Sequence, residues 1–325
     1  MKVTFLGTTV LLFDDGVDQI LFDAHLTRPS LPRFLFGNLQ TDEALVERVL
    51  GRCPMDRLKG IFISHSHYDH ALDMPYLAKR TGAAVFGSSS ALNVARGGNV
   101  PEAQLHDYAG GIAVTAVDND TARMSGTGEA KGKAVANEGN SVSSLNANRV
   151  TPNQPIATYK VGRFTIDILP SVHSKPNAFN NDLGQTIDEP LVQPAKKKFF
   201  KEGGSFDFVV HHENEPACII RPSFGFIPGE MDGHQAKVLF LGVAGLAKVD
   251  DNEKKRFYEE TLDKVKPEVV VPVHWDCFFR SIEKAATGYP FFIENSKAVE
   301  AEIGKACRER GMAHKYLQPF ASIEF

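Results

Sequence analysis

One short segment concentrates side chains that can bind metal ions. His65, His67, Asp69 and His70 occupy four of the six positions in His-Ser-His-Tyr-Asp-His, directly after the apolar run 60–64. Side chains at i and i+2 of an extended chain point to the same side, so His65 and His67 can bind one cation. Asp69 and His70 follow where the chain turns toward a helix, and they can point at a second cation close by. This set of oxygen and nitrogen ligands suits zinc, manganese or iron.

A solvated polar loop is the simplest alternative for this segment. Three imidazoles and a carboxylate crowded at the mouth of a buried strand are costly without a metal, so we favour the metal site. Two isolated histidines also follow predicted strands, His173 after residues 164–169 and His274 after residues 268–273. Without partners, a histidine in such a place is more often structural.

The histidine-rich segment resembles the second motif of the metallo-β-lactamase superfamily, and the resemblance extends over nearly the whole chain. Asp23, at the end of Leu-Phe-Asp, resembles the first motif, which supports the metal loop from beneath. His173 and His274 resemble the third and last motifs. The resemblance implies one or two divalent cations, zinc above all and manganese or iron as alternatives. It implies two groups of ligands: His65, His67 and His173 in the first, and Asp69, His70 and His274 in the second.

One motif departs from the family pattern. The family usually places a metal-bridging Asp after a strand, in a Gly-Asp-Thr-like turn, whereas Ser223 stands in the corresponding stretch 218–225. A neutral hydroxyl cannot bridge two dications as a carboxylate does, so a state with two cations loses one unit of ligand charge. The second site could then be weak, empty or filled by another metal. Asp232 and Asp276 are alternative carboxylates, although neither spacing favours them.

The resemblance implies a hydrolase. A cation held by the three histidines would lower the pKa of its bound water from about 15.7 toward 7 and so supply hydroxide at neutral pH. Asp69 and His70 are the expected catalytic residues. Asp69 would orient the nucleophile and accept its proton, while a second cation, or protonated His70 or His274 in its absence, would stabilise charge on the substrate.

The expected substrate is a small-molecule ester, lactone or phosphodiester. Tyr68 and the ending Pro-x-His-x-x-x-Phe at residues 272–278 resemble the branch that includes ascorbate-phosphate lactonases and N-acylphosphatidylethanolamine-hydrolysing phospholipases, more than the antibiotic-hydrolysing members. Two other functions stay open. One is a mononuclear-iron oxidoreductase on the same fold. The other is a non-catalytic metal-binding or ligand-binding protein, for which the only support is Ser223.

The elements that would position these residues alternate between short strands and helices. Strands lead, and β and α segments then mix, twice over, which indicates an α/β (α+β) protein with two packed sheets and helices outside. This is the four-layer αββα sandwich that the resemblance also implies. We expect one domain over residues 1–325, with polar excursions at about 118–154 and 174–204. Asp73 is expected to cap a helix that has Pro75 in its first turn and ends at Gly82.

The composition is that of a globular protein. The 325 residues are 42% hydrophobic and 23% charged, with a formal net charge of -4, so nothing draws the whole chain to nucleic acid. Four scattered cysteines without a Cys-x-x-Cys pair fit a reduced compartment, and we expect a cytoplasmic protein. No apolar run approaches the roughly 20 residues that span a bilayer, so integral membrane association is not expected. The oligomeric state is left open.

Four further features have simple readings. The run Lys196–Lys198 could touch a phosphate or a membrane surface, but a solvated charge run is the default. His211 and His212 are expected in a solvated turn. Trp275 could line the pocket or pack in the core. Asp276 could orient a histidine through a hydrogen bond.

Overall fold

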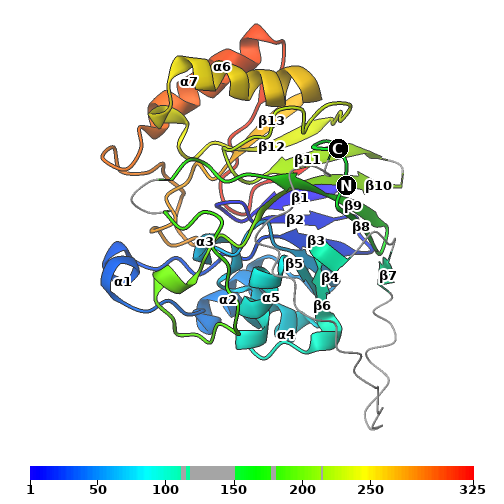
Figure 1. Cartoon of the computed structure of the whole chain (residues 1–325), viewed down its shortest axis with the longest axis vertical. Helices are drawn as coiled ribbons and strands as arrows, with labels where there is room; N and C mark the ends of the chain where they lie inside the picture. The colour runs from blue at the N-terminus through cyan, green and yellow to red at the C-terminus, as the bar shows by residue number, and fades with distance from the viewer. Residues whose placement is uncertain (111–114, 118–150, 177–180, 214) are drawn as a thin grey trace.

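The computed structural model describes residues 1–110, 115–117, 151–176, 181–213 and 215–325. Two mixed β-sheets lie face to face, and helices cover the outer side of each sheet (Figure 1). The predicted αββα sandwich is therefore confirmed. In the described part of the chain, no helix combines the length and the apolar character needed to cross a bilayer.

The first sheet has the strand order β15-β1-β2-β3-β4-β5-β6. Strands β1, β2 and β3 form an antiparallel meander, and β3, β4 and β5 run parallel to one another. The carboxyl ends of these parallel strands therefore meet at one edge, where Asp23 and the segment from His65 to His70 follow them. The bounds are β1 Lys2–Phe5, β2 Leu11–Asp14, β3 Gln19–Phe22, β4 Leu58–Phe62, β5 Ala84–Gly87, β6 Leu105–Asp107 and β15 Ser322–Glu324.

The second sheet has the order β14-β13-β12-β11-β10-β9-β8-β7. Strand β10 is antiparallel to both β9 and β11, whereas β11, β12 and β13 are parallel, so β9, β11, β12 and β13 all point the same way. His173, Ser223 and His274 follow three of these strands and gather at one edge. The bounds are β7 Thr115–Val117, β8 Ala157–Val161, β9 Phe164–Ser171, β10 Ser205–His212, β11 Glu215–Arg221, β12 Val238–Gly242, β13 Val269–Val273 and β14 Ala313–His314.

The space between the sheets is filled by aromatic side chains. Phe62 stacks on Phe86 with ring centroids 4.4 Å apart, and Phe22 packs on Phe62 and Phe208 at 5.5 Å and 5.0 Å. These fully buried rings belong to a core cluster that draws on both sheets, and their burial holds the two site-bearing edges together. Two further apolar clusters fill the outer layers, one between the first sheet and its helices and one between the second sheet and its helices.

The helices pack on the outer faces of the two sheets, where their apolar sides are buried. On the first sheet lie α2 Glu43–Arg52, α4 Met74–Thr81 and α5 Ser89–Gly97; on the second lie α6 Asp251–Tyr258 and α7 Ser296–Glu309 (Figure 1). Helix α6 is continued by a π-helical turn at Glu259–Asp263. Two short helices, α1 Leu31–Phe36 and α3 Tyr68–Ala71, lie beside the site. Single 3-10 turns occur at Glu102–Gln104, Tyr108–Gly110, Lys197–Phe199 and Leu246–Lys248.

Two sequence expectations need comment. Asp73 precedes α4, which has Pro75 in its first turn and ends at left-handed Gly82, but the Asp73 side chain makes no cap. Its carboxylate instead accepts hydrogen bonds from the backbone N–H groups of Leu26 and Thr27, at 2.7 Å and 2.6 Å. The capping prediction is wrong because the loop after β3 offers donors within reach. Most of the excursion expected at 118–154 lies outside the described residues, and the single domain stays a prediction.

Candidate metal centre

A buried carboxylate supports the centre from below. Asp23 follows β3 with a left-handed backbone (φ 53°) and is fully buried. Its oxygens accept hydrogen bonds from the backbone N–H and the hydroxyl of Ser64, at 2.8 Å and 2.9 Å, and from the hydroxyl of Thr9. Oδ2 also lies 2.7 Å from Nδ1 of His70. Asp23 therefore joins the loops after β3 and β4 and fixes one edge of the His70 ring.

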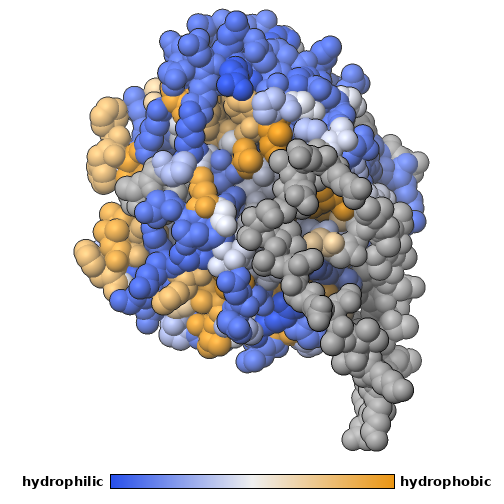
Figure 2. Space-filling model, in the orientation of Figure 1, coloured by the Kyte–Doolittle hydropathy of each residue, from blue (hydrophilic) through white to orange (hydrophobic). Residues whose placement is uncertain are grey.

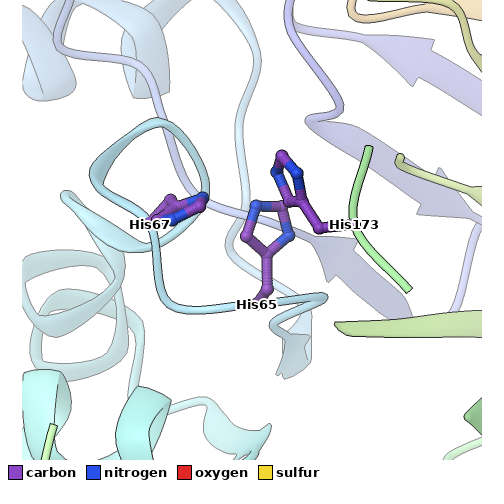
Figure 3. A group of neighbouring side chains, drawn as sticks. All are labelled: His65, His67 and His173. Carbon is purple, nitrogen blue, oxygen red and sulfur yellow. The ribbon is translucent and has the colours of Figure 1, made fainter. Parts of the chain in front are cut away.

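The segment from His65 to His70 divides into two conformations. His65 and His67 lie on extended chain after β4, while Asp69 and His70 lie on the single helical turn α3. This change places the two pairs in different groups, one with His173 and one with His274. In each group the potential ligand atoms lie within 4.8 Å of one another. Figure 3 shows the rings of the three-histidine group directed toward one another.

The second sheet supplies one histidine to each group. His173 follows β9, and its ring centroid lies 4.8 Å from that of His65 and 5.0 Å from that of His67. His274 follows β13 with a left-handed backbone (φ 59°), and its N–H donates to the carbonyl of Thr8 at 2.6 Å. Nε2 of His274 lies 3.3 Å from Oδ2 of Asp69. Both sheets must therefore be docked for either group to be complete.

The donor atoms fit divalent cations. Nε2 of His65 and Nε2 of His70 are buried and have no hydrogen-bond partner in the described part of the chain. Burial and the neighbouring histidines lower the pKa of His65 well below its usual value, and burial lowers the pKa of His173 to about 3. Both imidazoles are therefore neutral, which is the form that binds a metal. Burial opposes ionisation of Asp69, but nearby His70 and His274 hold its pKa well below the usual range.

The strand ends beside the two groups supply no carboxylate. Ser223, after β11, lines the pocket over the groups, and so do Ala244 and Gly245 after β12. Asp232 instead forms an ion pair with Lys264 at 2.7 Å, and its side chain is 58% exposed.

Asp276 is buried but serves another contact. Its carboxylate accepts the N–H of Thr8 at 2.8 Å and an N–H of Arg28 at 3.1 Å. Neither Asp232 nor Asp276 takes the place of the bridging carboxylate. Because Asp276 binds Thr8 and Arg28, it ties the loop after β13 to the loop after β1 rather than orienting an imidazole.

Residues 181–204, the described main part of the second excursion, form a wall of the centre, which the sequence did not indicate. The backbone N–H of Ser66 donates to the carbonyl of Glu202 at 2.8 Å, and its hydroxyl donates to the carbonyl of Lys201 at 2.7 Å. Oδ1 of Asp182 lies 3.2 Å from Nε2 of His67. Because these contacts join residues more than a hundred positions apart, no local pattern could reveal them.

Three minor candidates lie outside the pocket. His211 pairs with Asp167 at 3.1 Å, and His212 pairs with Asp15 at 2.7 Å. Trp275 packs edge-on against Tyr316 and contacts two core clusters. Both histidines end β10 and do not lie in a turn: His211 is exposed as expected, but the side chain of His212 is only 7% exposed, so the solvated position predicted for it is wrong. Trp275 packs in the core, one of the two expected outcomes.

A cavity of about 190 Å³ lies over both groups. Aromatic side chains form much of its wall, among them Phe34, Tyr68, Phe278 and Tyr289. The hydroxyl of Tyr289 lies 3.3 Å from Nδ1 of His274. Hydrophobic surface lies over α1 and over the segment before α7, on one side of the molecule (Figure 2), where Phe36 and Phe291 are 81% and 80% exposed. The cavity suits a small molecule with an apolar portion.

The chain is similar in sequence to known metal-dependent proteins. A family model described as the beta-lactamase superfamily domain matches residues 18–156. A UPF0173 metal-dependent hydrolase of Chloroflexus aurantiacus is 32% identical over 99 residues, which are 29% of this chain and 39% of that protein. The match therefore spans well under two thirds of the relative's length.

Solved structures share the fold. The zinc-bound protein PqqB of Methylobacterium extorquens has a TM-score of 0.50 at 10% identity, with 100% of both chains covered. The di-iron β-hydroxylase CmlA of Streptomyces venezuelae has a TM-score of 0.51 at 12% identity, with 100% of this chain and 54% of that chain covered. At these identities the likeness concerns the fold alone.

Two packed mixed sheets, outer helices and two groups of potential metal ligands at one edge define an αββα sandwich with a candidate metal centre. The sequence match is more specific: residues 18–156 are similar to the beta-lactamase superfamily domain.

Proposed function

We propose that this protein is a metal-dependent hydrolase of a small-molecule ester, lactone or phosphodiester. The observation that carries the proposal is the convergence of six side chains from both sheets into two adjacent groups beneath one cavity. In this proposal His65, His67 and His173 hold one cation, and Asp69, His70 and His274 hold a second where it is present. Zinc is the first candidate and iron or manganese the alternatives, because neutral imidazole and carboxylate suit all three.

The protein's own groups prepare the ligands. Asp23 fixes Nδ1 of His70, which leaves the unpartnered Nε2 to face the cation. Nδ1 of His173 lies 3.1 Å from the hydroxyl of Ser174, and Asp182 contacts one nitrogen of His67. Such contacts set the tautomer and direction of each ring. A bound cation would lower the pKa of water and polarise a substrate oxygen.

Asp69 is the proposed proton acceptor. Its carboxylate lies at the cavity wall, and neighbouring histidines keep its pKa low, so it is ionised at neutral pH. It would orient the attacking water and take its proton. Burial disfavours charged His274, but the hydrogen bond and charge of Asp69 raise its pKa. In a state with one cation, protonated His274 would stabilise negative charge on the substrate oxygen.

Elemental analysis of the purified protein tests the proposal, with metal-to-chain ratios for the wild type and for His67→Ala and Asp69→Ala. His211→Ala is the matched control, because His211 lies outside the pocket. We expect loss of the first cation in His67→Ala and loss of the second in Asp69→Ala, with full occupancy in the control. Unchanged occupancy in both site variants would refute the ligand assignment.

Activity is measured on the same preparations with an ester, lactone and phosphodiester panel. Hydrolysis of a panel member that disappears in Asp69→Ala supports the proposal. Stoichiometric metal without hydrolysis supports a non-catalytic binding protein, whereas bound iron with oxygen consumption supports an oxidoreductase. The branch within the superfamily and the cytoplasmic location stay predictions; the four cysteines, all free, are compatible with a reducing compartment.

A further inference from the structure

Lysines line the cavity although the chain as a whole is acidic. Lys197, Lys198 and Lys201 come from the wall formed by residues 181–204, and Lys248 comes from the 3-10 turn after β12. The formal net charge of the chain is -4, so four lysines at one cavity are more positive charge than the composition of the whole chain would suggest. Part of the basic run that the sequence presents as a solvated stretch thus faces the site.

Lys197 is the lysine most closely associated with the centre. Its Nζ lies 5.0 Å from the centre of the Phe34 ring, which also lines the cavity. Burial lowers the pKa of Lys197, while the charges of Asp182 and Asp69, two carboxylates that line the cavity, raise it. Lys197 therefore presents a positive charge to a molecule bound in the cavity.

Lys201 and Lys248 lack a carboxylate within ion-pair distance in the residues that the structure describes. Some lysines elsewhere form such ion pairs; Lys264 binds Asp232 at 2.7 Å, for example. The charge of Lys201 acts on Asp182, and that of Lys248 acts on Glu294, which also lines the cavity. Positive charge therefore reaches the cavity from two sides.

The ligand set does not neutralise this charge. Four lysines and three carboxylates, those of Asp69, Asp182 and Glu294, line the cavity, and of these carboxylates only Asp69 belongs to the two groups. A bound dication would add further positive charge to the cavity floor. An anionic group on the substrate would balance the charge of the lysines and of the dication. Its oxygens would accept charge-assisted hydrogen bonds from the lysines.

We infer that the substrate carries an anionic group, a carboxylate or a phosphate, which binds Lys197 and Lys201 while the scissile bond lies over the histidine groups. The apolar part of the substrate then lies against the aromatic wall that includes Phe34 and Phe278. This inference rests on the proposed hydrolase function and names the substrate class of the same site. It also gives residues 181–204 a role in specificity.

The test compares two esters that differ by one charge. The mono-4-nitrophenyl ester of terephthalic acid is an anion at neutral pH, and its rigid ring keeps the carboxylate away from the ester carbonyl; its methyl ester is neutral. Hydrolysis of the 4-nitrophenyl ester in either compound releases 4-nitrophenol. Both are assayed with the purified metal-loaded protein and with the double variant Lys197→Gln/Lys201→Gln. The control is Lys196→Gln, an exposed lysine of the same run that does not line the cavity.

We expect the ratio of kcat/KM for the anionic ester to that for the neutral ester to fall about tenfold or more in the double variant, as expected for loss of hydrogen bonds to a charged group. The ratio in Lys196→Gln should equal that of the wild type. An unchanged ratio in the double variant, or an equal fall in the control, would overturn the inference. Circular dichroism and metal content establish that each variant is folded and loaded.

Binding of inorganic phosphate, measured by calorimetry on the same proteins, separates this inference from the proposed function. If neither ester is hydrolysed but phosphate binds about tenfold more weakly to the double variant than to Lys196→Gln, the anion site stands and the hydrolase proposal fails. If both esters are hydrolysed and phosphate affinity is the same in all proteins, the hydrolase proposal stands and the anion site is refuted.

Discussion

Asp23 offers a sharp test of how the centre is organised, because one atom can be changed without changing its shape. In Asp23→Asn an NH₂ group replaces one carboxylate oxygen. The native carboxylate accepts hydrogen bonds from Ser64 and Thr9 and lies 2.7 Å from Nδ1 of His70. An amide NH₂ group donates hydrogen bonds. It therefore either faces another donor, which is unfavourable, or donates to Nδ1 of His70, which then has to be unprotonated. In the second case the ring proton moves to Nε2, the nitrogen expected to bind the cation.

The size of the effect follows from these contacts. Replacing a residue that orients a metal-binding histidine typically lowers metal affinity 10–100-fold, or about 1.4–2.8 kcal/mol. We therefore expect such a loss at the group of Asp69, His70 and His274. Loss of a hydrogen bond to a charged group costs about 1.5–3 kcal/mol, so the metal-free protein should be destabilised by a similar amount.

Chelator-competition titrations measure the affinity, and urea unfolding of metal-free protein measures the stability. Asp14→Asn is the matched control, because Asp14 contacts none of the proposed ligands; its partners are Arg57, in a surface ion pair worth about 0–1 kcal/mol, and the N–H groups of Gly16 and Gln19. Affinity of the Asp69 group equal to that of the wild type, in a folded Asp23→Asn protein, would refute the argument that Asp23 sets the tautomer of His70.

Four other predictions concern buried charges around the sandwich. Arg221→Met should lower the unfolding free energy by about 3–5 kcal/mol, since it leaves Asp207 and Glu230 buried without their cation; urea unfolding measures this, and a loss under about 1 kcal/mol contradicts it. Burial and Asp207 raise the pKa of Glu230 well above its usual 4.5, so its contribution to stability is present below about pH 4.5 and is lost as the pH rises through the folded-state value. Glu230→Gln should therefore show a smaller decline in stability from pH 5 to 8 than the wild type. Asp182→Asn should weaken cation binding by the three-histidine group about tenfold in chelator competition, and wild-type affinity would argue against an orienting contact. In the metal-free protein, burial lowers the pKa of His173 from 6.5 to about 3, so the unfolded state binds more protons between these values and stability should fall as the pH drops from about 6.5 to 3; a flat profile contradicts this.

The parts of the fold that the sequence predicts are those determined locally. The apolar runs 60–64, 164–169 and 268–273 correspond to β4, β9 and β13. The spacing from His65 to His70 likewise determines which side chains can share a group, because extended chain and a helical turn direct them differently. The structure brings all six expected side chains together, while their roles as ligands stay predictions.

The parts that the sequence does not predict depend on contacts between distant segments. Asp73 looks like a helix cap, but the donors it meets belong to Leu26 and Thr27. The basic run near Lys197 looks solvated, and only the hydrogen bonds from Ser66 to the wall place it at the cavity. Polarity is a sound guide to exposure for an isolated segment, but not where a loop is held over a site.

The division of the proposed ligands between the sheets links metal loading to the assembly of the sandwich. The family match at residues 18–156 includes Asp23 and the segment from His65 to His70 but neither His173 nor His274. A cation bound to either group would cross-link the sheets at one edge, and its binding free energy would oppose their separation, by about 4.1 kcal/mol at a free concentration 1,000 times Kd. Amide hydrogens of β4 and β13 should then exchange with solvent more slowly once the cation is added, even though no residue of either strand contacts it.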